Sequence, residues 1–429
     1  MKRLISFAAA AAVLFAAAPK TPSYAAETPA GASCVVYKVE KDHISIDGIG
    51  KDFRNGDLVI PEKIDGLPVT CIRENTFFHC EGLKTCVIPD SVEKIGNRAF
   101  FDCPDLVSVT IGSGASEIDS LSFSACPELT SVTIGKGAAN ISGYAFSACP
   151  KLSSFTVSKD NQSYSSVNSC LCSKNGDTLV KYAGGSSAAV PDKIKTIGEG
   201  AFFEREDMTS VSIPDTVTSI DDAAFSGCLS LKSVEFPDSV KSLGDSCFMS
   251  CNSLSKVRLG SSLKAIPDSC FYSCTSLNNI IIPDNVESID CDAFFSCASL
   301  SGIYIPKTVT TINEDAIGRR YDTRQSSSEN ISGFVIKGEK GSAAEKYASE
   351  NGIIFGTRVL QKGDVTGDGV IDAVDASTVL SEYALTSTDK PSSFNVEQVI
   401  AADYDNNTAV NAVDASLILT KYAENAVKH

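Results

Sequence analysis

The feature that most constrains the fold is a unit of 23 residues that repeats along most of the chain. Units that begin at Leu83, Leu106 and Leu129 follow one another without a gap, and the same period resumes from Met208 to Ser299. Each unit reads roughly L-x-S-V-x-I-P-x-x-V-x-x-I-x-x-x-A-F-x-x-C-x-x. A unit this short cannot bury its own apolar face, so it must stack on its neighbours. The repeat therefore predicts a β-rich solenoid of about ten coils.

Two apolar positions recur in every unit and predict the interior of the solenoid. One position is aromatic, and Ile317 replaces the aromatic residue in a tenth unit: Phe77, Phe100, Phe123, Phe146, Phe202, Phe225, Phe248, Phe271 and Phe294. The other is an aliphatic residue five positions earlier: Ile72, Ile95, Ile118, Ile141, Ile197, Ile220, Leu243, Ile266, Ile289 and Ile312. The tract Leu231–Pro237 alternates apolar and polar residues, which indicates a short strand closed by proline. Successive strands should pair in parallel, with Val234 and Phe236 facing inward.

Half of the 16 cysteines occupy one repeat position, three residues after the aromatic: Cys80, Cys103, Cys126, Cys149, Cys228, Cys251, Cys274 and Cys297. We interpret them as small buried residues that fill identical slots in identical coils. Disulfides between adjacent coils remain an alternative, because the spacing of neighbouring strands falls within the allowed Cα separation. Zinc is disfavoured, because the sequence contains neither a Cys-x-x-Cys pair nor a histidine cluster.

These residues resemble the BspA-like leucine-rich repeat of exported bacterial surface proteins, over Cys34 to Gly356. The resemblance implies an N-terminal cap hairpin at residues 35–39 and 64–69 and a closing helix at residues 341–348. Two interruptions are expected, an irregular loop at about residues 158–185 and a polar stretch at residues 318–330.

The N-terminus has the pattern of a secretory signal peptide. Positive charge at Lys2 and Arg3 precedes an apolar run from Leu4 to Ala18, and small residues then predict cleavage after Ala25. The run is shorter than the roughly 20 residues that span a bilayer, so we expect a secreted chain without membrane insertion. The net charge of −16 argues against nucleic acid as a partner.

Two twelve-residue segments near the C-terminus, residues 364–375 and 403–414, match each other and are each followed by an apolar helical pattern. Oxygen-bearing side chains occupy positions 1, 3, 5, 9 and 12 of both segments. This spacing suits calcium, a hard cation that prefers six to eight oxygen ligands, with a backbone carbonyl supplied by position 7. The duplication predicts two calcium ions.

The duplicated module resembles the type I dockerin of cellulosome-like complexes over Gly363 to about Ala423. The resemblance implies calcium ligands at Asp364, Thr366, Asp368, Asp372 and Asp375, the carbonyl of Val370, and at Asp403, Asp405, Asn407, Asn411 and Asp414, the carbonyl of Ala409. It also implies a cohesin-binding face at Ala373, Val374, Leu380, Ser381, Ala412, Val413, Leu419 and Thr420. Two residues depart from the pattern. Thr366 replaces a stronger ligand at position 3, and Thr408 replaces the glycine of position 6.

Positions 10 and 11 are Ala-Val in both loops. The resemblance therefore implies that a cohesin can bind through either half, which gives two orientations of the complex. Glu382 on one helix and Lys421 on the other are a charge difference that we expect to bias one orientation.

We therefore expect a signal peptide at residues 1–25, an N-terminal cap region at 26–57, repeats at 58–330, a C-terminal cap at 331–357 and a dockerin at 358–429. The expected function is that of a non-catalytic accessory component, which docks to a cohesin of a scaffoldin and uses the solenoid for protein recognition or as a spacer. The alternative is a polysaccharide-degrading or carbohydrate-binding protein with an unrecognised site on the solenoid. No catalytic residue is predicted, because the serine-elbow, metal-ligand and Rossmann motifs are missing from the sequence.

Outward strand positions of the solenoid change character near its C-terminal end. They are mostly serine and threonine in the first half, whereas charged, amide and aromatic groups gather in the second half. The expected ligand patch, for an unknown protein or glycan, is Glu235, Lys256, Arg258, Asn279 and Tyr304. Ordinary surface variation is the competing explanation.

Overall fold

The computed structural model describes residues 32–426, except 55, 323–326, 358–359, 368–369, 389 and 391. The expected signal peptide therefore lies outside the described residues. Within the described part of the chain, no helix combines the length and the apolar character needed to cross a bilayer.

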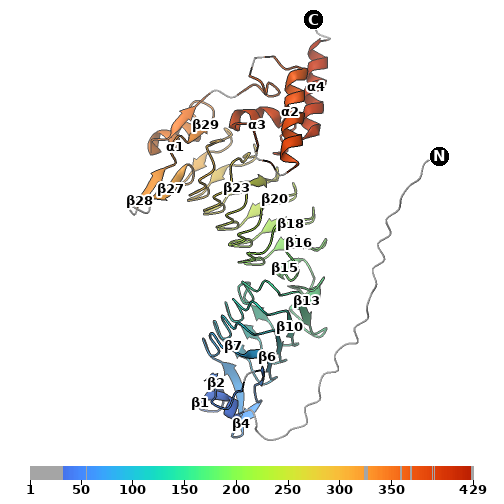
Figure 1. The fold of residues 1–429 in the computed structure, drawn as a ribbon, viewed down its shortest axis with the longest axis vertical. Coiled ribbons are helices and arrows are strands. Elements are labelled where there is room, and N and C mark those ends of the chain that lie inside the picture. Colours follow the sequence, from blue (N-terminus) through green and yellow to red (C-terminus); the bar gives the residue numbers. More distant parts are fainter. Residues whose placement is uncertain are drawn as a thin grey trace, which may run out of the picture.

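The repeats form a solenoid of about 13 turns with short parallel strands, which confirms the predicted fold class (Figure 1). Its first ladder of strands consists of β3 (Gly56–Val59), β6 (Leu83–Ile88), β8 (Ser108–Ile111), β10 (Ser131–Ile134), β12 (Ser154–Val157), β16 (Ser187–Ala189), β18 (Ser210–Ser212), β20 (Ser233–Glu235), β22 (Lys256–Arg258), β25 (Gly302–Tyr304), β29 (Val335–Lys337) and β30 (Ile354–Gly356). In neighbouring strands, residues one repeat apart lie opposite each other, such as Ser108 and Ser131.

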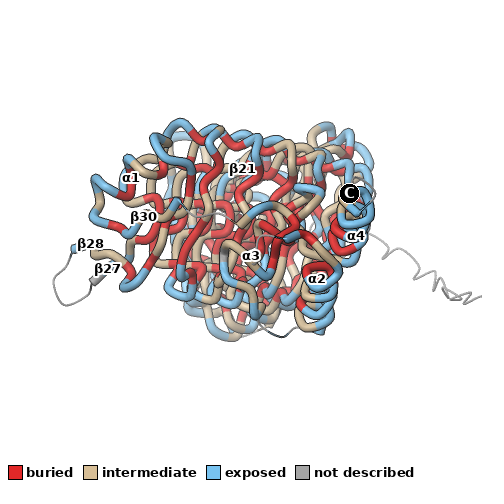
Figure 2. Tube along the Cα trace, turned by 90° about the horizontal axis from the view of Figure 1, so that it is seen from above, coloured by how far each residue is buried: buried red, intermediate tan, exposed pale blue. Residues whose placement is uncertain are grey.

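A second ladder, which the sequence analysis did not anticipate, runs along another side of the coils. It contains β5 (Leu67–Ile72), β7 (Lys94–Ile95), β9 (Glu117–Ile118), β11 (Asn140–Ile141), β17 (Thr196–Ile197), β19 (Ser219–Ile220), β21 (Ser242–Leu243), β23 (Ala265–Ile266), β24 (Ser288–Ile289) and β26 (Thr311–Ile312). Most of these strands have two residues, and the second is the recurring aliphatic. The two ladders close each coil around its buried apolar side chains. Figure 2 shows the buried positions along the chain in red.

The recurring aromatic residues form continuous stacks inside the coils. Ring centroids of neighbouring residues lie 4.6 Å apart for Phe202 and Phe225 and 5.7 Å apart for Phe248 and Phe271. One stack runs from Phe77 to Phe146 and a second from Phe202 to Phe294. Tyr182 extends the second stack, with its ring 4.9 Å from that of Phe202. Offset stacking of this kind adds to the stabilisation that comes from burying the rings.

The ladder cysteines also contribute to the interior. Each thiol of the following set donates to the carbonyl oxygen of the phenylalanine 26 residues earlier, over 3.1 to 3.3 Å: Cys103, Cys126, Cys149, Cys228, Cys251, Cys274 and Cys297. They are thiols and not disulfides in the structure. The interpretation as buried slot-filling residues agrees with this arrangement for these seven, whereas Cys80 is only half-buried.

The segment expected to be an irregular loop is an ordered antiparallel meander. It contains β13 (Tyr164–Val167), β14 (Cys170–Ser173) and β15 (Thr178–Lys181), and β15 joins the second ladder through β17. Cys170, Leu171 and Cys172 are buried in it, and this burial explains why the segment is ordered. The meander separates the solenoid interior into two apolar cores.

The ends of the solenoid are capped. At the N-terminus a 3₁₀ turn (Ala32–Cys34) precedes β1 (Val35–Val39), which pairs antiparallel with β2 (Ile44–Ile49), while β4 (Lys63–Ile64) pairs with β5. The expected single hairpin is thus two. At the C-terminus β27 (Arg319–Asp322) pairs with β28 (Ser327–Asn330), and α1 (Ala343–Asn351) closes the last coil.

The C-terminal module is helical and contains α2 (Ala373–Thr386), α3 (Val396–Ala402) and α4 (Ala412–Ala426). Helices α2 and α4 pack side by side (Figure 1). A small separate core holds them together, which includes Val365, Ile371, Val379 and Ile418. The two loops that precede α2 and α4 are the predicted calcium loops.

Candidate calcium sites and docking faces

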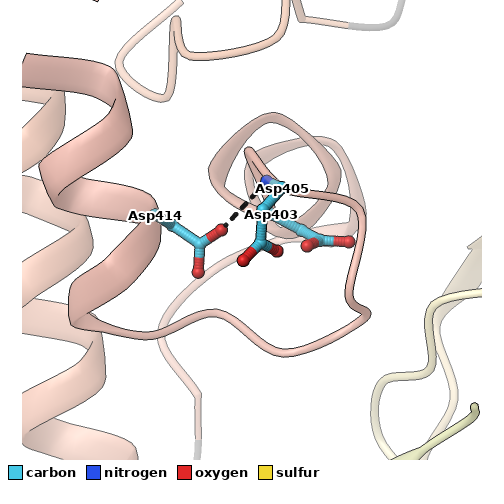
Figure 3. Close-up of side chains that lie close together, drawn as sticks. All are labelled: Asp403, Asp405 and Asp414. Atoms are coloured by element: carbon cyan, nitrogen blue, oxygen red, sulfur yellow. Dashed lines mark hydrogen bonds between the residues drawn. The ribbon is translucent and has the colours of Figure 1, made fainter. Parts of the chain in front are cut away.

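The second loop brings three predicted calcium ligands together (Figure 3). Carboxylate oxygens of Asp403, Asp405 and Asp414 lie within 4.8 Å of one another. Asp403 follows the last turn of α3, and Asp414 lies in the first turn of α4. The loop between them folds back so that residues eleven positions apart face each other.

Backbone N–H groups hold these carboxylates in place. Asp414 accepts hydrogen bonds from the N–H groups of Tyr404 at 2.8 Å and Asn411 at 2.8 Å. Asp403 accepts hydrogen bonds from the N–H groups of Asn407 at 3.0 Å and Thr408 at 3.1 Å. The loop backbone is thus organised around the same two carboxylates that the sequence places at positions 1 and 12.

The electrostatics of this site favour a bound cation. Burial, together with the neighbouring charge of Asp414, raises the pKa of Asp403 to about 7. Burial also raises the pKa of Asp414. Two buried carboxylates in contact repel each other, and a divalent cation removes that repulsion. The donor set is all oxygen, which suits calcium.

The remaining ligands predicted for the second loop lie around this acidic cluster. The side-chain oxygen of Asn407 accepts a hydrogen bond from the N–H of Ala409 at 2.8 Å, and that of Asn411 accepts one from the N–H of Val413 at 2.7 Å. The amide of Asn411 donates to the carbonyl oxygen of Ala409 at 3.0 Å. Calcium binding at the predicted positions would exchange some of these local bonds for coordination.

The first loop holds its carboxylates at positions 1 and 12 by similar backbone hydrogen bonds. Asp375 is buried and accepts hydrogen bonds from the N–H of Thr366 at 2.9 Å and that of Asp372 at 2.9 Å. The hydroxyl of Thr366 also donates to Asp375, at 3.0 Å. Asp364 accepts a hydrogen bond from the N–H of Gly367 at 2.7 Å. Asp368 lies outside the described residues, and Val370 is exposed.

The predicted cohesin-binding residues lie on exposed parts of α2 and α4. Equivalent side chains are exposed to similar degrees, 56% for Val374 and 54% for Val413, 44% for Leu380 and 43% for Leu419. Ala373, Ser381, Ala412 and Thr420 are exposed as well. The two halves therefore offer matching apolar faces.

One residue of the expected charge bias, Glu382, does not lie on the exposed face. Glu382 is buried, and its carboxylate accepts hydrogen bonds from both the N–H and the hydroxyl of Ser393. The side chain of Lys421 pairs with Glu424 at 3.4 Å. Glu382 lies in the interior of the module because Ser393, which lies between α2 and α3, packs against its carboxylate.

The predicted solenoid patch lies against the C-terminal module. Glu235, Lys256, Arg258 and Asn279 line a groove of about 780 Å³ between the first ladder and α2. Tyr304 is half-buried on β25, the strand against which α3 packs. Arg258, which was expected at an outward position for an external ligand, donates from its Nε–H to the carbonyl oxygen of Asn407 at 2.9 Å. The only sequence signal near this contact was the departure at Thr408.

Comparison with known families matches both parts of the chain. A model described as the BspA type leucine rich repeat region matches residues 63–174 and 195–321 in six copies. A model described as the dockerin type I domain matches residues 362–422. No curated protein matches the chain.

Three of the solved structures that match the chain are leucine-rich repeat proteins, each with a TM-score below 0.5. One from Eubacterium ventriosum has 19% identity and a TM-score of 0.48, and the match covers 67% of this chain and 92% of that one. A leucine rich cell surface protein from Faecalibacterium prausnitzii has 23% identity and a TM-score of 0.32, with 72% and 97% covered. The leucine rich repeat protein of T. pallidum has 26% identity and a TM-score of 0.34, with 53% and 91% covered.

Proposed function

The chain belongs to the family of BspA-type leucine-rich repeat proteins and ends in a type I dockerin domain, and from this premise we propose that it is a non-catalytic accessory component of an extracellular, cellulosome-like complex. In this proposal a signal peptide at residues 1–25 directs export. The dockerin, residues 358–429, binds a cohesin module of a scaffoldin, and the repeats at 58–330 recognise another protein or act as a spacer. The scaffold would hold the chain at the cell surface.

The observation that carries the proposal is the duplicated calcium loop with its matching exposed faces. Type I dockerin domains bind calcium and imply a cohesin as partner. In this chain two ions would be held by the predicted ligands of the two loops, and the converging carboxylates of Asp403, Asp405 and Asp414 fit one of them. Calcium supplies charge neutralisation there, which lets the helices hold their apolar faces at fixed positions.

The non-catalytic part of the proposal rests on the types of domain in the chain and on the structural roles of their residues. Leucine-rich repeat solenoids and dockerins are non-catalytic domain types. The apolar positions of the repeats fill the solenoid interior, and His79 lies at its surface, where it pairs with Asp102 over 2.7 Å. Within the residues that the structure describes, the helices and strands belong to the caps, the repeats and the dockerin.

The test is a capture experiment with the full secreted chain immobilised. Extracellular proteins of the source bacterium are passed over it with calcium or with a chelator, and retained proteins are identified by mass spectrometry. The proposal expects a cohesin-bearing scaffoldin that is retained only with calcium. Retention of polysaccharide alone, unaffected by the chelator, would instead support a carbohydrate-binding protein.

A further inference from the structure

The second calcium loop contacts the solenoid of its own chain. Arg258 on β22 donates from Nε to the carbonyl oxygen of Asn407 at 2.9 Å. The hydroxyl of Thr408 donates to the carbonyl oxygen of Leu259 at 2.6 Å. An ion pair between Lys337 on β29 and Glu397 on α3 provides a further link. These contacts join residues that are far apart in the sequence.

Arg258 is held in the conformation that makes this contact. One guanidinium nitrogen donates to the carbonyl oxygen of Phe236 at 2.7 Å, and another lies 3.2 Å from the carboxylate of Asp238. Its side chain is only 19% exposed. A side chain already held by the preceding coil of the solenoid loses little conformational entropy when it binds the loop. The solenoid therefore presents a preformed donor to Asn407.

Thr408 occupies a position that this loop type gives to glycine. Its φ angle is 63°, in the left-handed region that a β-branched residue avoids. The equivalent residue of the first loop is Gly369. Strain of this kind persists where surrounding contacts hold it in place, and Thr408 is buried with its hydroxyl on the solenoid. A glycine at this position would have no hydroxyl to offer to Leu259.

The turn that carries both contacts depends on a calcium ligand. The N–H groups of Asn407 and Thr408 donate to the two carboxylate oxygens of Asp403. Asp403 in turn faces Asp414 across the site, and both are buried. A cation that binds these carboxylates would fix the turn in the shape that fits Arg258 and Leu259.

We propose that the turn at Asn407 and Thr408 is a calcium-dependent latch, which holds the dockerin on the first ladder of its own solenoid. The calcium dependence rests on the proposed function, whereas the contact itself does not. Val374 and Val413 remain exposed in the latched arrangement, so a cohesin can bind while the latch is closed. The latch would then set the direction in which the solenoid projects from the scaffold.

Hydrogen exchange of the full secreted chain, followed by mass spectrometry, tests the latch with calcium as the probe. The variants are Arg258→Ala, which removes the solenoid donor, and Thr408→Gly, which removes the hydroxyl and relieves the backbone strain. Lys256→Ala is the matched control, because Lys256 is an exposed cation on the same strand that lines the same groove. Peptides from the first loop are an internal reference within each sample.

With calcium, the amides of residues 404–410 should exchange at least roughly tenfold faster in both variants than in the wild type and the control. Arg258→Ala loses a hydrogen bond from a charged group, and Thr408→Gly loses the contact of the hydroxyl with Leu259. The first-loop peptides should be unchanged, and the chelator should speed exchange in both loops. Unchanged exchange of residues 404–410 in Thr408→Gly would overturn the latch, and so would equal acceleration of both loops.

Failure of the latch and failure of the proposed function are distinguishable in the same samples. Calcium calorimetry and cohesin binding are measured on the wild type and on Thr408→Gly. The latch predicts that Thr408→Gly still binds two calcium ions and the cohesin, although its second loop exchanges faster. If Thr408→Gly exchanges faster than the wild type but the wild type binds no cohesin, the latch is supported and the proposed function is wrong.

Discussion

Lys181 joins the two halves of the solenoid at the level of a single residue. It is buried, and its ammonium donates to the carbonyl oxygens of Gly143 at 3.1 Å and Gly200 at 2.8 Å and to the hydroxyl of Ser147 at 2.9 Å. Gly143 and Ser147 precede the meander, whereas Gly200 follows it. The cation thus satisfies carbonyl groups where the regular pairing of coils is interrupted.

Lys181 predicts a pH dependence of stability. Burial lowers the pKa of Lys181 from 10.5 to about 7. Below pH 7 the amine of Lys181 is protonated in both the folded and the unfolded chain, so the cost of burying its charge does not change with pH. Above pH 7 the amine loses its proton in the folded chain but keeps it in the unfolded chain. The free energy of unfolding should therefore rise with pH, by up to about 1.4 kcal/mol per unit, relative to Lys181→Met. Urea unfolding of both proteins from pH 6 to pH 9 measures this difference, and parallel curves would refute it.

The ladder cysteines predict a pattern of chemical reactivity. Burial raises the pKa of Cys297 to about 12, and it also raises the pKa of Cys274. Because the thiolate is the reactive form, both residues should resist an alkylating reagent in the folded protein. After denaturation without a reductant, both should be alkylated completely, as mass spectrometry would show. Cysteines that become reactive only after reduction would establish disulfides in place of thiols.

At the scale of elements, much of the solenoid could be predicted because its signal is periodic. The recurring Phe and Cys positions identify the inside of each coil, and the structure places Phe225 and Cys251 there. The second ladder could not be predicted, because a strand such as Ser219–Ile220 has only one inward residue and shows no alternation. The meander was missed because Cys170–Ser173 pairs with neighbours outside the repeat.

Helices α2 and α4 predict two nearly redundant docking faces. Val374 and Val413 follow identical alanines and are equally exposed. Replacing Ala373 and Val374 together with charged residues should leave substantial binding to a type I cohesin, and so should the same changes at Ala412 and Val413. All four changes should abolish binding. Titration calorimetry gives the affinities, and loss of binding from either pair alone would exclude two orientations.

At the scale of the whole molecule, the dockerin lies against the solenoid near its C-terminal end (Figure 1). This contact was beyond sequence reasoning, because Arg258 and Asn407 are 149 residues apart and no repeat relates them. Four of the five residues expected to bind an external ligand line the groove beside the dockerin, namely Glu235, Lys256, Arg258 and Asn279. Arg258 binds the chain's own loop there.

In the proposed function, this chain joins a larger complex through calcium-dependent binding of its dockerin to a cohesin. The most direct measurement is the equilibrium binding of the full secreted chain to purified type I cohesins, with calcium and with a chelator. We expect a one-to-one complex with at least one cohesin, which the chelator dissociates because the loops lose the cation that holds α2 and α4 in place. Binding that persists in chelator, or no binding to any cohesin while both calcium sites are filled, would contradict it.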